Sequence, residues 1–296
     1  MRRLLAGLTL PAALLAQSAH ADENLFGYVA GAETLPKGSG ELYQWVTSRD
    51  DKGQGTYHAI NTKTELEYGV TDRFSTSASL KMQSIDTHGL IIDGYLPKAE
   101  KYGLRPSGVE LGMKYNFLKP ALDPIGLATY FSVNYDWLDP HSGQDKDTLS
   151  MELKLLAQKY FMEGRLIWVG NLGMESTYAD RAEIDNLPAG FDWPTDPEME
   201  IEFKTGTGLS YRFVDNWYIG AETVYETEFE TEVGQERWSV FLGPTLHYAS
   251  KKWWATLTWF KQVKGGGEMY AGQQDHDLHL VEKTEQEVRL KLGYNF

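Results

Sequence analysis

Segments in which apolar and polar residues alternate recur along nearly the whole chain, and this pattern constrains the fold more than any other feature. The last ten residues, EVRLKLGYNF, show it clearly, because Val288, Leu290 and Leu292 share one parity, and Arg289 and Lys291 share the other. Alternation with a period of two is typical of a β-strand with one apolar and one polar face. We therefore predict a strand that runs to the final residue.

Eleven further segments alternate in the same way, which brings the predicted strands to twelve. The twelve predicted strands span residues 40–49, 57–70, 73–84, 107–117, 126–137, 148–160, 165–176, 198–213, 217–230, 236–248, 253–264 and 282–296. Most reach the roughly 9–11 residues that a tilted strand needs to cross a bilayer. A soluble β-sandwich also has many short strands, so the strands alone do not choose between the two folds.

The links between the predicted strands alternate in length, which favours a membrane barrel. Short links at 70–73, 161–165, 213–217 and 249–253 alternate with long polar links at 85–106, 138–147, 177–197 and 265–281. Outer-membrane barrels have short periplasmic turns and longer outside loops, whereas a sandwich has no reason to sort its loops in this way. Two links depart from the rule, since 118–125 is long and 231–235 is short for its place. We expect an all-β fold, a single antiparallel transmembrane β-barrel of about twelve strands.

The chain begins like an exported protein. Arg2 and Arg3 precede an apolar stretch, and an A-x-A pattern ends at Ala21, so residues 1–21 read as a cleaved signal peptide. We assign 22–39 to an N-terminal segment, either in the periplasm or as a short insert in the lumen, and 40–296 to the barrel. Tyr and Trp make up much of the 13% aromatic content and gather at strand ends, where lipid meets water in a barrel.

Bulk composition excludes several classes of function. The net charge of −14 argues against nucleic-acid binding, and removal of the leader makes it two units more negative. The chain has no cysteine, which excludes disulfides, thiol catalysis and Cys-based zinc sites. No stretch after the leader approaches 18 consecutive apolar residues, the minimum for a transmembrane helix.

Two stretches and the chain end resemble known outer-membrane proteins. The terminal strand ending in Tyr294 and Phe296 resembles the signal that passes Gram-negative barrels to their assembly machinery. The turn YGVTDRF at 68–74 is similar to a periplasmic turn of porin-type and transporter-type barrels, and residues 23–45 resemble the start of an uncharacterised family of small outer-membrane β-barrels. This resemblance implies a Gram-negative outer-membrane location, with lipid, lipopolysaccharide and the assembly machinery as partners. It implies no activity.

The predicted inward face carries charges that sort along the barrel axis. We predict an outer mouth that attracts cations, formed by Glu198, Glu200, Glu202, Glu222, Glu226, Glu228 and Glu230. The basic residues deeper in the lumen include Lys204, Arg212, Arg289 and Lys291. Carboxylates on a wet face can be solvated or paired with residues such as Lys204 and Arg237. Alternatively they attract cations into a pore or hold divalent cations. No calcium-loop motif is present, so we predict no dedicated metal site.

Few residues offer catalytic chemistry. His141 and Ser142 lie together on a predicted outside loop, and Asp275, His276, Asp277 and His279 form a polar group that could bind a transition metal or could be ordinary loop surface. We predict no cofactor, no catalytic residue and no enzyme. The leading hypothesis is a passive channel for small polar solutes with an acidic outer mouth. A non-conducting barrel with ligand-binding or partner-binding outer loops is the alternative, and a lipid-modifying enzyme is the third.

Overall fold

The computed structural model describes residues 24–92, 99–140, 142–183, 195–230, 234–269 and 272–296. These residues form twelve strands and one short 3₁₀ turn, η1 (Met162–Gly164). The strands are β1 (Gly40–Asp50), β2 (Gln54–Thr71), β3 (Phe74–Ile91), β4 (Glu100–Leu118), β5 (Gly126–Leu138), β6 (Asp145–Phe161), β7 (Leu166–Arg181), β8 (Glu198–Val214), β9 (Trp217–Glu230), β10 (Gly234–Ala249), β11 (Trp253–Gly267) and β12 (Gln286–Asn295). In this part of the chain, no helix has the length and apolar character needed to cross a membrane.

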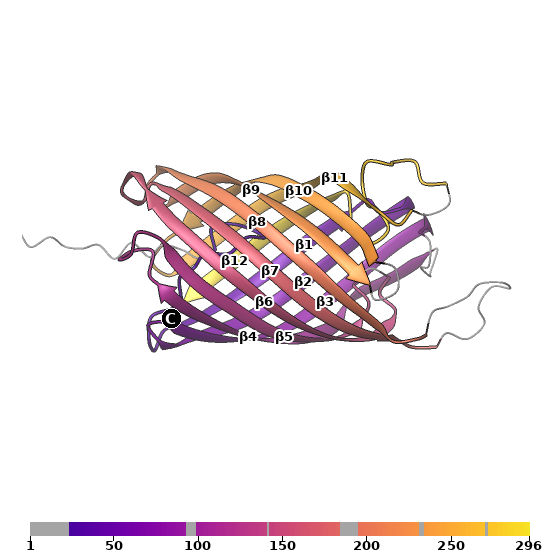
Figure 1. The fold of residues 1–296 in the computed structure, drawn as a ribbon, viewed down its shortest axis with the longest axis horizontal. Coiled ribbons are helices and arrows are strands. Elements are labelled where there is room, and N and C mark those ends of the chain that lie inside the picture. Colours follow the sequence, from indigo (N-terminus) through magenta and orange to yellow (C-terminus); the bar gives the residue numbers. More distant parts are fainter. Residues whose placement is uncertain (1–23, 93–98, 141, 184–194, 231–233, 270–271) are drawn as a thin grey trace, which may run out of the picture.

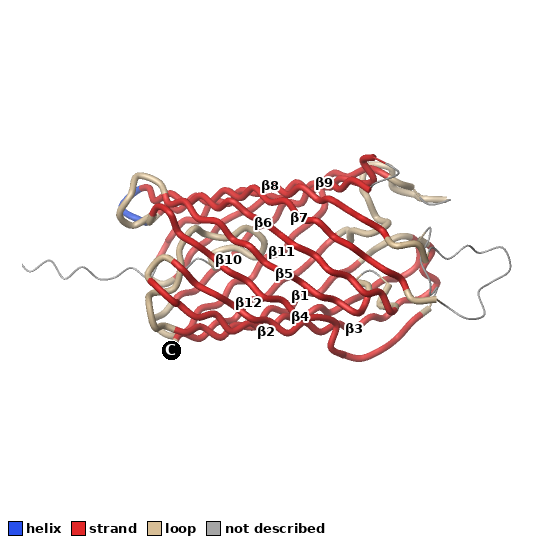
Figure 2. The backbone as a smooth tube through the Cα atoms, turned by 60° about the horizontal axis from the view of Figure 1, so that its bottom comes forward, coloured by secondary structure: helices blue, strands red, loops and turns tan. Residues whose placement is uncertain are grey.

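The twelve strands close into one antiparallel barrel, in which each strand pairs with its neighbours in sequence and β12 pairs with β1 (Figure 1). The strands run obliquely around the barrel axis (Figure 2). Where the barrel closes, Leu42 lies opposite Tyr294, and Gly40 and Phe296 exchange two backbone hydrogen bonds of 2.8 and 2.9 Å. Closure leaves no unpaired strand edge, which β-structure in a bilayer requires.

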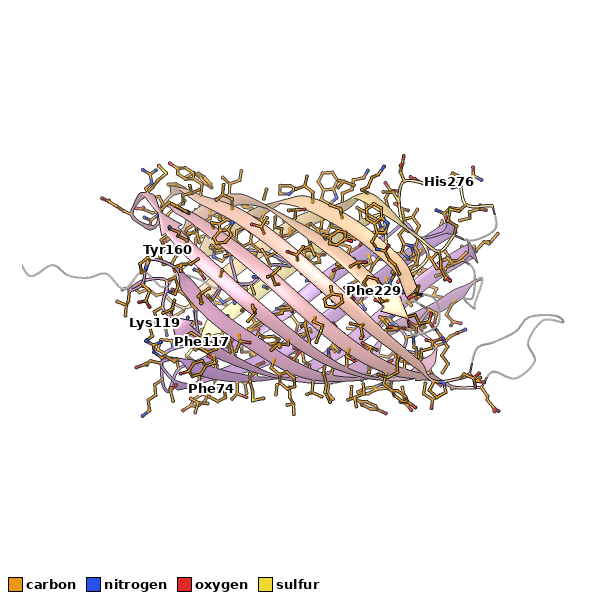
Figure 3. All side chains as sticks on the ribbon, viewed as in Figure 1. Phe74, Phe117, Lys119, Tyr160, Phe229 and His276 are labelled. Carbon is orange, nitrogen blue, oxygen red and sulfur yellow. The ribbon has the colours of Figure 1, made fainter. Side chains whose placement is uncertain are left out.

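The barrel is apolar outside and polar inside. On β4, Leu111 and Met113 are exposed, whereas Glu110 and Lys114, which alternate with them, are buried. Side chains project outward along the whole wall, with Phe117 near the end that carries the C-terminus (Figure 3). An outward apolar face with aromatic residues toward its ends is typical of a membrane-spanning barrel. We call the end with the C-terminus and most short turns the inner end, and the other the outer end.

The predicted all-β barrel and its twelve strands are confirmed, but some strands reach farther outward than expected. β3 continues to Ile91 and β4 begins at Glu100, within the predicted loop 85–106. Backbone pairing can continue beyond the bilayer without an apolar face, so the loss of alternation does not mark the strand end. The last strand is shorter than predicted because β12 begins at Gln286, and residues 282–285 precede it.

Two segments fold into the lumen. Residues 24–35, which we call the N-terminal segment, pass inside the barrel and pack against its wall. Residues 272–285, which we call the outer loop, turn inward from the outer end and bury Leu280 and Val281. The predicted leader at 1–21 lies outside the described residues. Both segments narrow the space that a solute could use.

Candidate functional site

The backbone of the N-terminal segment is held by one carboxylate on β9. Glu222 accepts hydrogen bonds from the backbone N–H groups of Gly27 (2.7 Å), Tyr28 (2.8 Å) and Val29 (2.9 Å). Thr258 on β11 donates a fourth at 3.0 Å. A buried carboxylate is tolerated when its lone pairs are satisfied in this way. Glu222 was predicted as part of the outer mouth, but its partners make it an anchor for this segment instead.

Amide side chains from the barrel wall hold the rest of the segment. Asn171 on β7 both donates to the backbone oxygen of Ala30 and accepts from its N–H, each at 2.8 Å. Gln158 accepts from the N–H of Ala32 at 2.8 Å, and Asn116 donates to the oxygen of Ala32 at 2.5 Å. These contacts satisfy the polar backbone of a chain that forms no strand inside the lumen. The segment is therefore a built part of the lumen.

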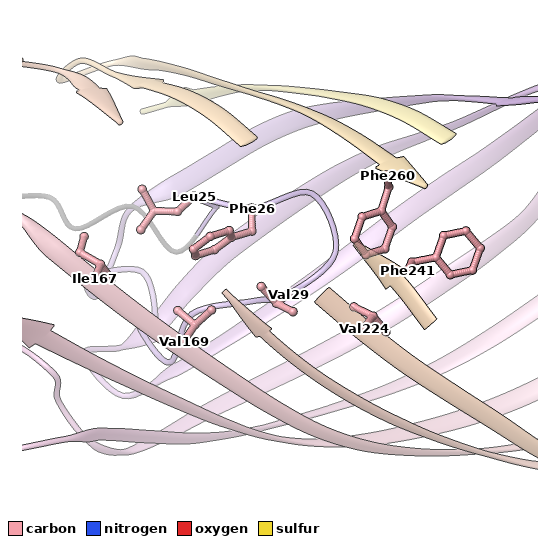
Figure 4. Packing of buried hydrophobic residues seen from close by; sticks show 8 residues of the cluster. All are labelled: Leu25, Phe26, Val29, Ile167, Val169, Val224, Phe241 and Phe260. Carbon is pink, nitrogen blue, oxygen red and sulfur yellow. The ribbon is translucent and has the colours of Figure 1, made fainter. Parts of the chain in front are cut away.

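Apolar packing adds to these hydrogen bonds. Leu25, Phe26 and Val29 are buried against a cluster on the barrel wall that consists of Ile167, Val169, Val224, Phe241 and Phe260 (Figure 4). Inward glycines make the room: a Cβ at Gly208 would lie 2.7 Å from the Phe26 ring, and one at Gly206 would lie 2.6 Å from Val29. Burial of large apolar side chains in this way stabilises docking by about 1.5–3 kcal/mol each.

Arg289 and Lys291 on β12 face the lumen as predicted, and both contact the N-terminal segment. Arg289 donates to the backbone oxygen of Gly27 at 3.0 Å, and Lys291 donates to that of Phe26 at 3.1 Å. The Tyr28 hydroxyl donates to Glu287 at 2.5 Å. Burial, together with the nearby Glu287 carboxylate, raises the pKa of the Tyr28 hydroxyl well above its usual value. Tyr28 is therefore a neutral donor at physiological pH.

The outer loop brings charges into the predicted acidic mouth. Lys283 forms an ion pair with Glu226 at 2.7 Å, and Glu282 pairs with Arg237. Burial acts to lower the pKa of Lys283, but the carboxylates of Glu202 and Glu226 outweigh it and raise that pKa. Lys283 is thus a fixed positive charge among the mouth carboxylates.

His279 on the same loop is buried, and neither ring nitrogen has a hydrogen-bond partner among the residues that the structure describes. Burial and the positive charges of Arg237, Lys283 and Lys52 lower the pKa of His279 to about 3. The imidazole is therefore neutral when the loop is docked.

Three of the cavities in the described part of the chain lie beside the two inserted segments. The large cavity has a volume of about 410 Å³, the middle cavity about 280 Å³ and the outer cavity about 180 Å³. Trp45 and Arg289 line both the large and the middle cavity, and Lys283 lines both the middle and the outer cavity. The shared walls place the cavities next to one another along the lumen.

Charge is distributed unevenly among these cavities. Seven acidic and three basic residues line the outer cavity, whereas three acidic and five basic residues line the middle one. The large cavity has six acidic and seven basic lining residues. The lumen thus changes from acidic at its outer end to slightly basic further in.

The other predicted mouth residues are on the lumen side, and most have cationic partners. Glu202 lies opposite Glu228 in the β8–β9 register, and Glu200 lies opposite Glu230. Glu228 pairs with Arg237, Glu202 pairs with Lys204 at 3.2 Å, and Glu198 pairs with Lys146 at 3.6 Å and with Arg181. Arg212 lies near the inner end, beside the turn that follows β8. The mouth is therefore less negative than its glutamates alone suggest.

Sequence reasoning missed Asn116, Gln158 and Asn171 as functional residues. The available signal was the position of these amides on the polar parity of predicted strands, together with an apolar stretch, Leu25 to Ala32, before the first strand. A side-chain amide that is buried in the middle of a strand needs a hydrogen-bond partner. A short apolar segment needs an apolar surface to pack against.

The candidate catalytic and metal residues do not come together in the part of the chain that the structure describes. Ser142 donates to Asp139 at 2.7 Å, and His141 lies outside the described residues. Asp277 pairs with Lys264 at 2.6 Å. Among the described residues, no group of three or more His, Asp or Glu side chains is placed to hold a metal ion.

A family model described as a family of unknown function, DUF6662, matches residues 18–296. The chain belongs to this family. No curated protein sequence matches this DUF6662 chain.

Solved structures share its fold at low sequence identity. The COG4313 outer membrane channel from Pseudomonas putida F1 has a TM-score of 0.56 and 12% identity, over 90% of this chain and 98% of that one. The beta domain of the Bordetella autotransporter BrkA has a TM-score of 0.54 and 12% identity, over 88% of this chain and all of that one. The translocator domain of autotransporter NalP from Neisseria meningitidis has a TM-score of 0.52 and 14% identity, over 87% and 88%. The DUF6662 chain is thus an outer-membrane-type β-barrel.

Proposed function

We propose that this protein is a passive channel for small polar solutes in the outer membrane of a Gram-negative bacterium. The observation that carries the proposal is the series of cavities beside the N-terminal segment, each lined by several charged residues. Arg289 lies in the walls of the large and middle cavities, and Lys283 lies in the walls of the middle and outer cavities. A barrel whose lumen had no transport role could fill this space with packed side chains, as small barrels do. The structurally similar Pseudomonas putida protein is described as an outer membrane channel, which agrees with the proposal.

The outer cavity suggests how solutes reach the lumen. Its excess of acidic over basic lining residues would raise the local concentration of cations at the outer end. Ion pairs such as Lys283 with Glu226 reduce this field, so the cation preference should be weak. The volumes, of 410 Å³ or less, favour solutes of a few carbon atoms over oligomers.

A non-conducting barrel is the second candidate, because a specific observation favours it. The N-terminal segment is held by hydrogen bonds along its backbone and by a buried apolar cluster, which are features of a permanent plug. In that case the described part of the outer loop, which includes exposed His276, would be a binding surface (Figure 3).

Conductance of the refolded mature protein in a planar bilayer separates the two candidates. A channel should give discrete single-channel currents in the intact protein, and deletion of residues 24–35 should increase them several-fold by widening the lumen. Currents that appear only after the deletion would support the plugged barrel. Heat-modifiable gel mobility of each preparation shows that the barrel is folded.

A further inference from the structure

Arg289 lies where the large and the middle cavity meet. It is half-buried on the lumen side of β12 and lines both cavities. Its Nε donates to Thr47 at 2.9 Å, and its Nη1 donates to the backbone oxygen of Gly27 at 3.0 Å. The Tyr28 ring lies 3.8 Å from the guanidinium carbon. Three neighbours therefore fix the position of this side chain.

The fixed guanidinium keeps unused donors. A guanidinium has five N–H groups in a rigid fork, and the two hydrogen bonds to Thr47 and Gly27 use two of them. Within the described residues, Nη2 makes no hydrogen bond and Arg289 forms no ion pair. Nη1 keeps one N–H and Nη2 keeps two, so the guanidinium still has donors for both oxygens of a carboxylate.

Among the described residues Arg289 forms no ion pair, whereas two nearby cations, Lys63 and Arg49, are each paired with a carboxylate. Lys63 is paired with Glu65 at 2.7 Å and with Glu110 at 2.9 Å. Arg49 is paired with Glu287 at 3.1 Å, and that carboxylate also accepts the Tyr28 hydroxyl. The positive charge of Arg289 therefore remains available at the junction of the cavities. An anionic group of a solute can compensate this charge.

Aromatic rings form the walls around this charge. The ring of Trp45 lies 5.2 Å from the guanidinium carbon of Arg289, and the ammonium groups of Lys63 and Lys291 lie 4.5 and 4.7 Å from the same ring. With Tyr28, the ring gives the junction an apolar surface beside a cation. This combination suits a small organic anion better than an inorganic ion, because the carbon chain of the organic anion can pack against the aromatic rings.

We infer that Arg289 is the centre of a binding subsite for the carboxylate of a small organic solute, with Tyr28 and Trp45 against its carbon chain. The inference rests on the proposed channel function in one respect only, that the bound solute is transported. The subsite can bind the solute whether or not the barrel conducts. It narrows the solute class from small and polar to small and carboxylate-bearing.

Binding of ¹³C-carboxyl butyrate to the refolded mature protein in detergent micelles tests the subsite. Line broadening of the labelled carbon in NMR spectra, with empty micelles subtracted, should saturate with butyrate and give a dissociation constant. Butyramide, which has the same size and no charge, should bind at least tenfold more weakly. Arg289→Gln should weaken butyrate binding at least tenfold, because the charged fork is lost. Arg289→Lys should bind at an intermediate level, since it keeps the charge and loses the fork.

A control variant makes the test specific. Arg212→Gln removes the same charge near the inner end, away from the residues that line the three cavities, and should leave butyrate binding unchanged. Equal loss in Arg212→Gln and Arg289→Gln would overturn the subsite, because binding would then depend on the total charge of the barrel and not on the position of Arg289.

Conductance recorded on the same preparations separates this inference from the proposed function. Butyrate binding that depends on Arg289 in a protein without currents would overturn the channel and keep the subsite. Currents in a protein whose butyrate affinity does not change in Arg289→Gln would overturn the subsite and keep the channel.

Discussion

The carboxylate of Glu222 accepts the backbone N–H of Gly27 at 2.7 Å, across 195 residues of sequence. This contact joins the N-terminal segment to β9. The adjacent N–H groups of Tyr28 and Val29 donate to the same carboxylate. One side chain thus satisfies three consecutive backbone donors. Since an unsatisfied buried N–H is unfavourable by about 1–3 kcal/mol, Glu222 is the single wall residue on which the segment depends most.

Glu222→Ala should release the N-terminal segment from the wall. Loss of the three hydrogen bonds should weaken docking by about 3 kcal/mol, or roughly a hundredfold. The chain has no cysteine, so Ala30→Cys introduces a unique thiol, and its labelling rate reports how often the segment undocks. Labelling should rise about a hundredfold with Glu222→Ala. Glu230→Ala, on the same face of β9 and away from the segment, should leave the rate unchanged; a comparable rise there would contradict the anchor role.

Docking of the outer loop should weaken as pH falls. The pKa of His279 is about 3 in the docked loop against about 6.5 in a solvated one, so the undocked state binds more protons at low pH. Docking stability is complete above pH 6.5 and is lost progressively between pH 6.5 and 3. At pH 5 the loss should be about 2 kcal/mol.

Hydrogen exchange of the outer-loop amides, corrected for its intrinsic pH dependence, measures this effect. His279→Phe should remove most of the difference between pH 7.5 and pH 5. His276→Phe is the matched control, because His276 is exposed on the same loop, and it should keep the wild-type difference. An unchanged pH dependence in His279→Phe would assign the effect to other groups.

The barrel could be predicted from sequence because its two solvents impose a strict pattern. Lipid outside and water inside require opposite residue types at alternate positions, so the parity of Leu290 and Lys291 on β12 already fixes which one faces the lumen. Strand length and link length follow from the same bilayer. These are local properties of the chain and can be read without knowing any contact.

The lumen contents could not be predicted in the same way. Glu222 shares its parity with Glu226 and Glu228, and nothing local tells that one binds backbone N–H groups while the others pair with Lys283 and Arg237. Which acidic residue pairs with which basic residue depends on how the two inserted segments fold back into the lumen. Neither segment has a periodic sequence pattern from which this could be predicted. Sequence therefore gave the lumen position of these residues but not their partners.

The mouth glutamates should set the weak cation preference of the proposed channel. Replacement of Glu226, Glu228 and Glu230 by Gln removes three negative charges and leaves Lys283 and Arg237 without their nearest carboxylates on β9. The mouth then becomes less negative, so the reversal potential in a potassium chloride gradient should shift away from that of a cation-preferring pore.

A control with the same change in total charge isolates the position of these residues. Replacement of Asp123, Glu163 and Asp215 by their amides removes three negative charges from the inner-end turns. It should leave the reversal potential nearly unchanged, because these turns lie away from the outer mouth. An equal shift in both triple variants would mean that net charge, not the mouth, sets selectivity.

Deletion of Phe296 should impair assembly of the barrel. Phe296 exchanges two backbone hydrogen bonds with Gly40, and its exposed ring lies near that of Tyr294, at a centroid distance of 6.4 Å. The deletion removes the last rung of the β1–β12 closure and the terminal aromatic that we propose the assembly machinery recognises. The folded fraction in membranes, measured by heat-modifiable mobility, should fall several-fold.

The alanine variant separates closure from recognition, because Phe296→Ala keeps both backbone hydrogen bonds and removes only the ring. If the ring is recognised, Phe296→Ala should assemble poorly in cells and yet refold in detergent with the wild-type yield. Phe213→Ala is the matched control, since Phe213 is an exposed aromatic near the inner end of β8, and it should assemble normally. Normal cellular assembly of Phe296→Ala would restrict the role of this residue to closure of the barrel.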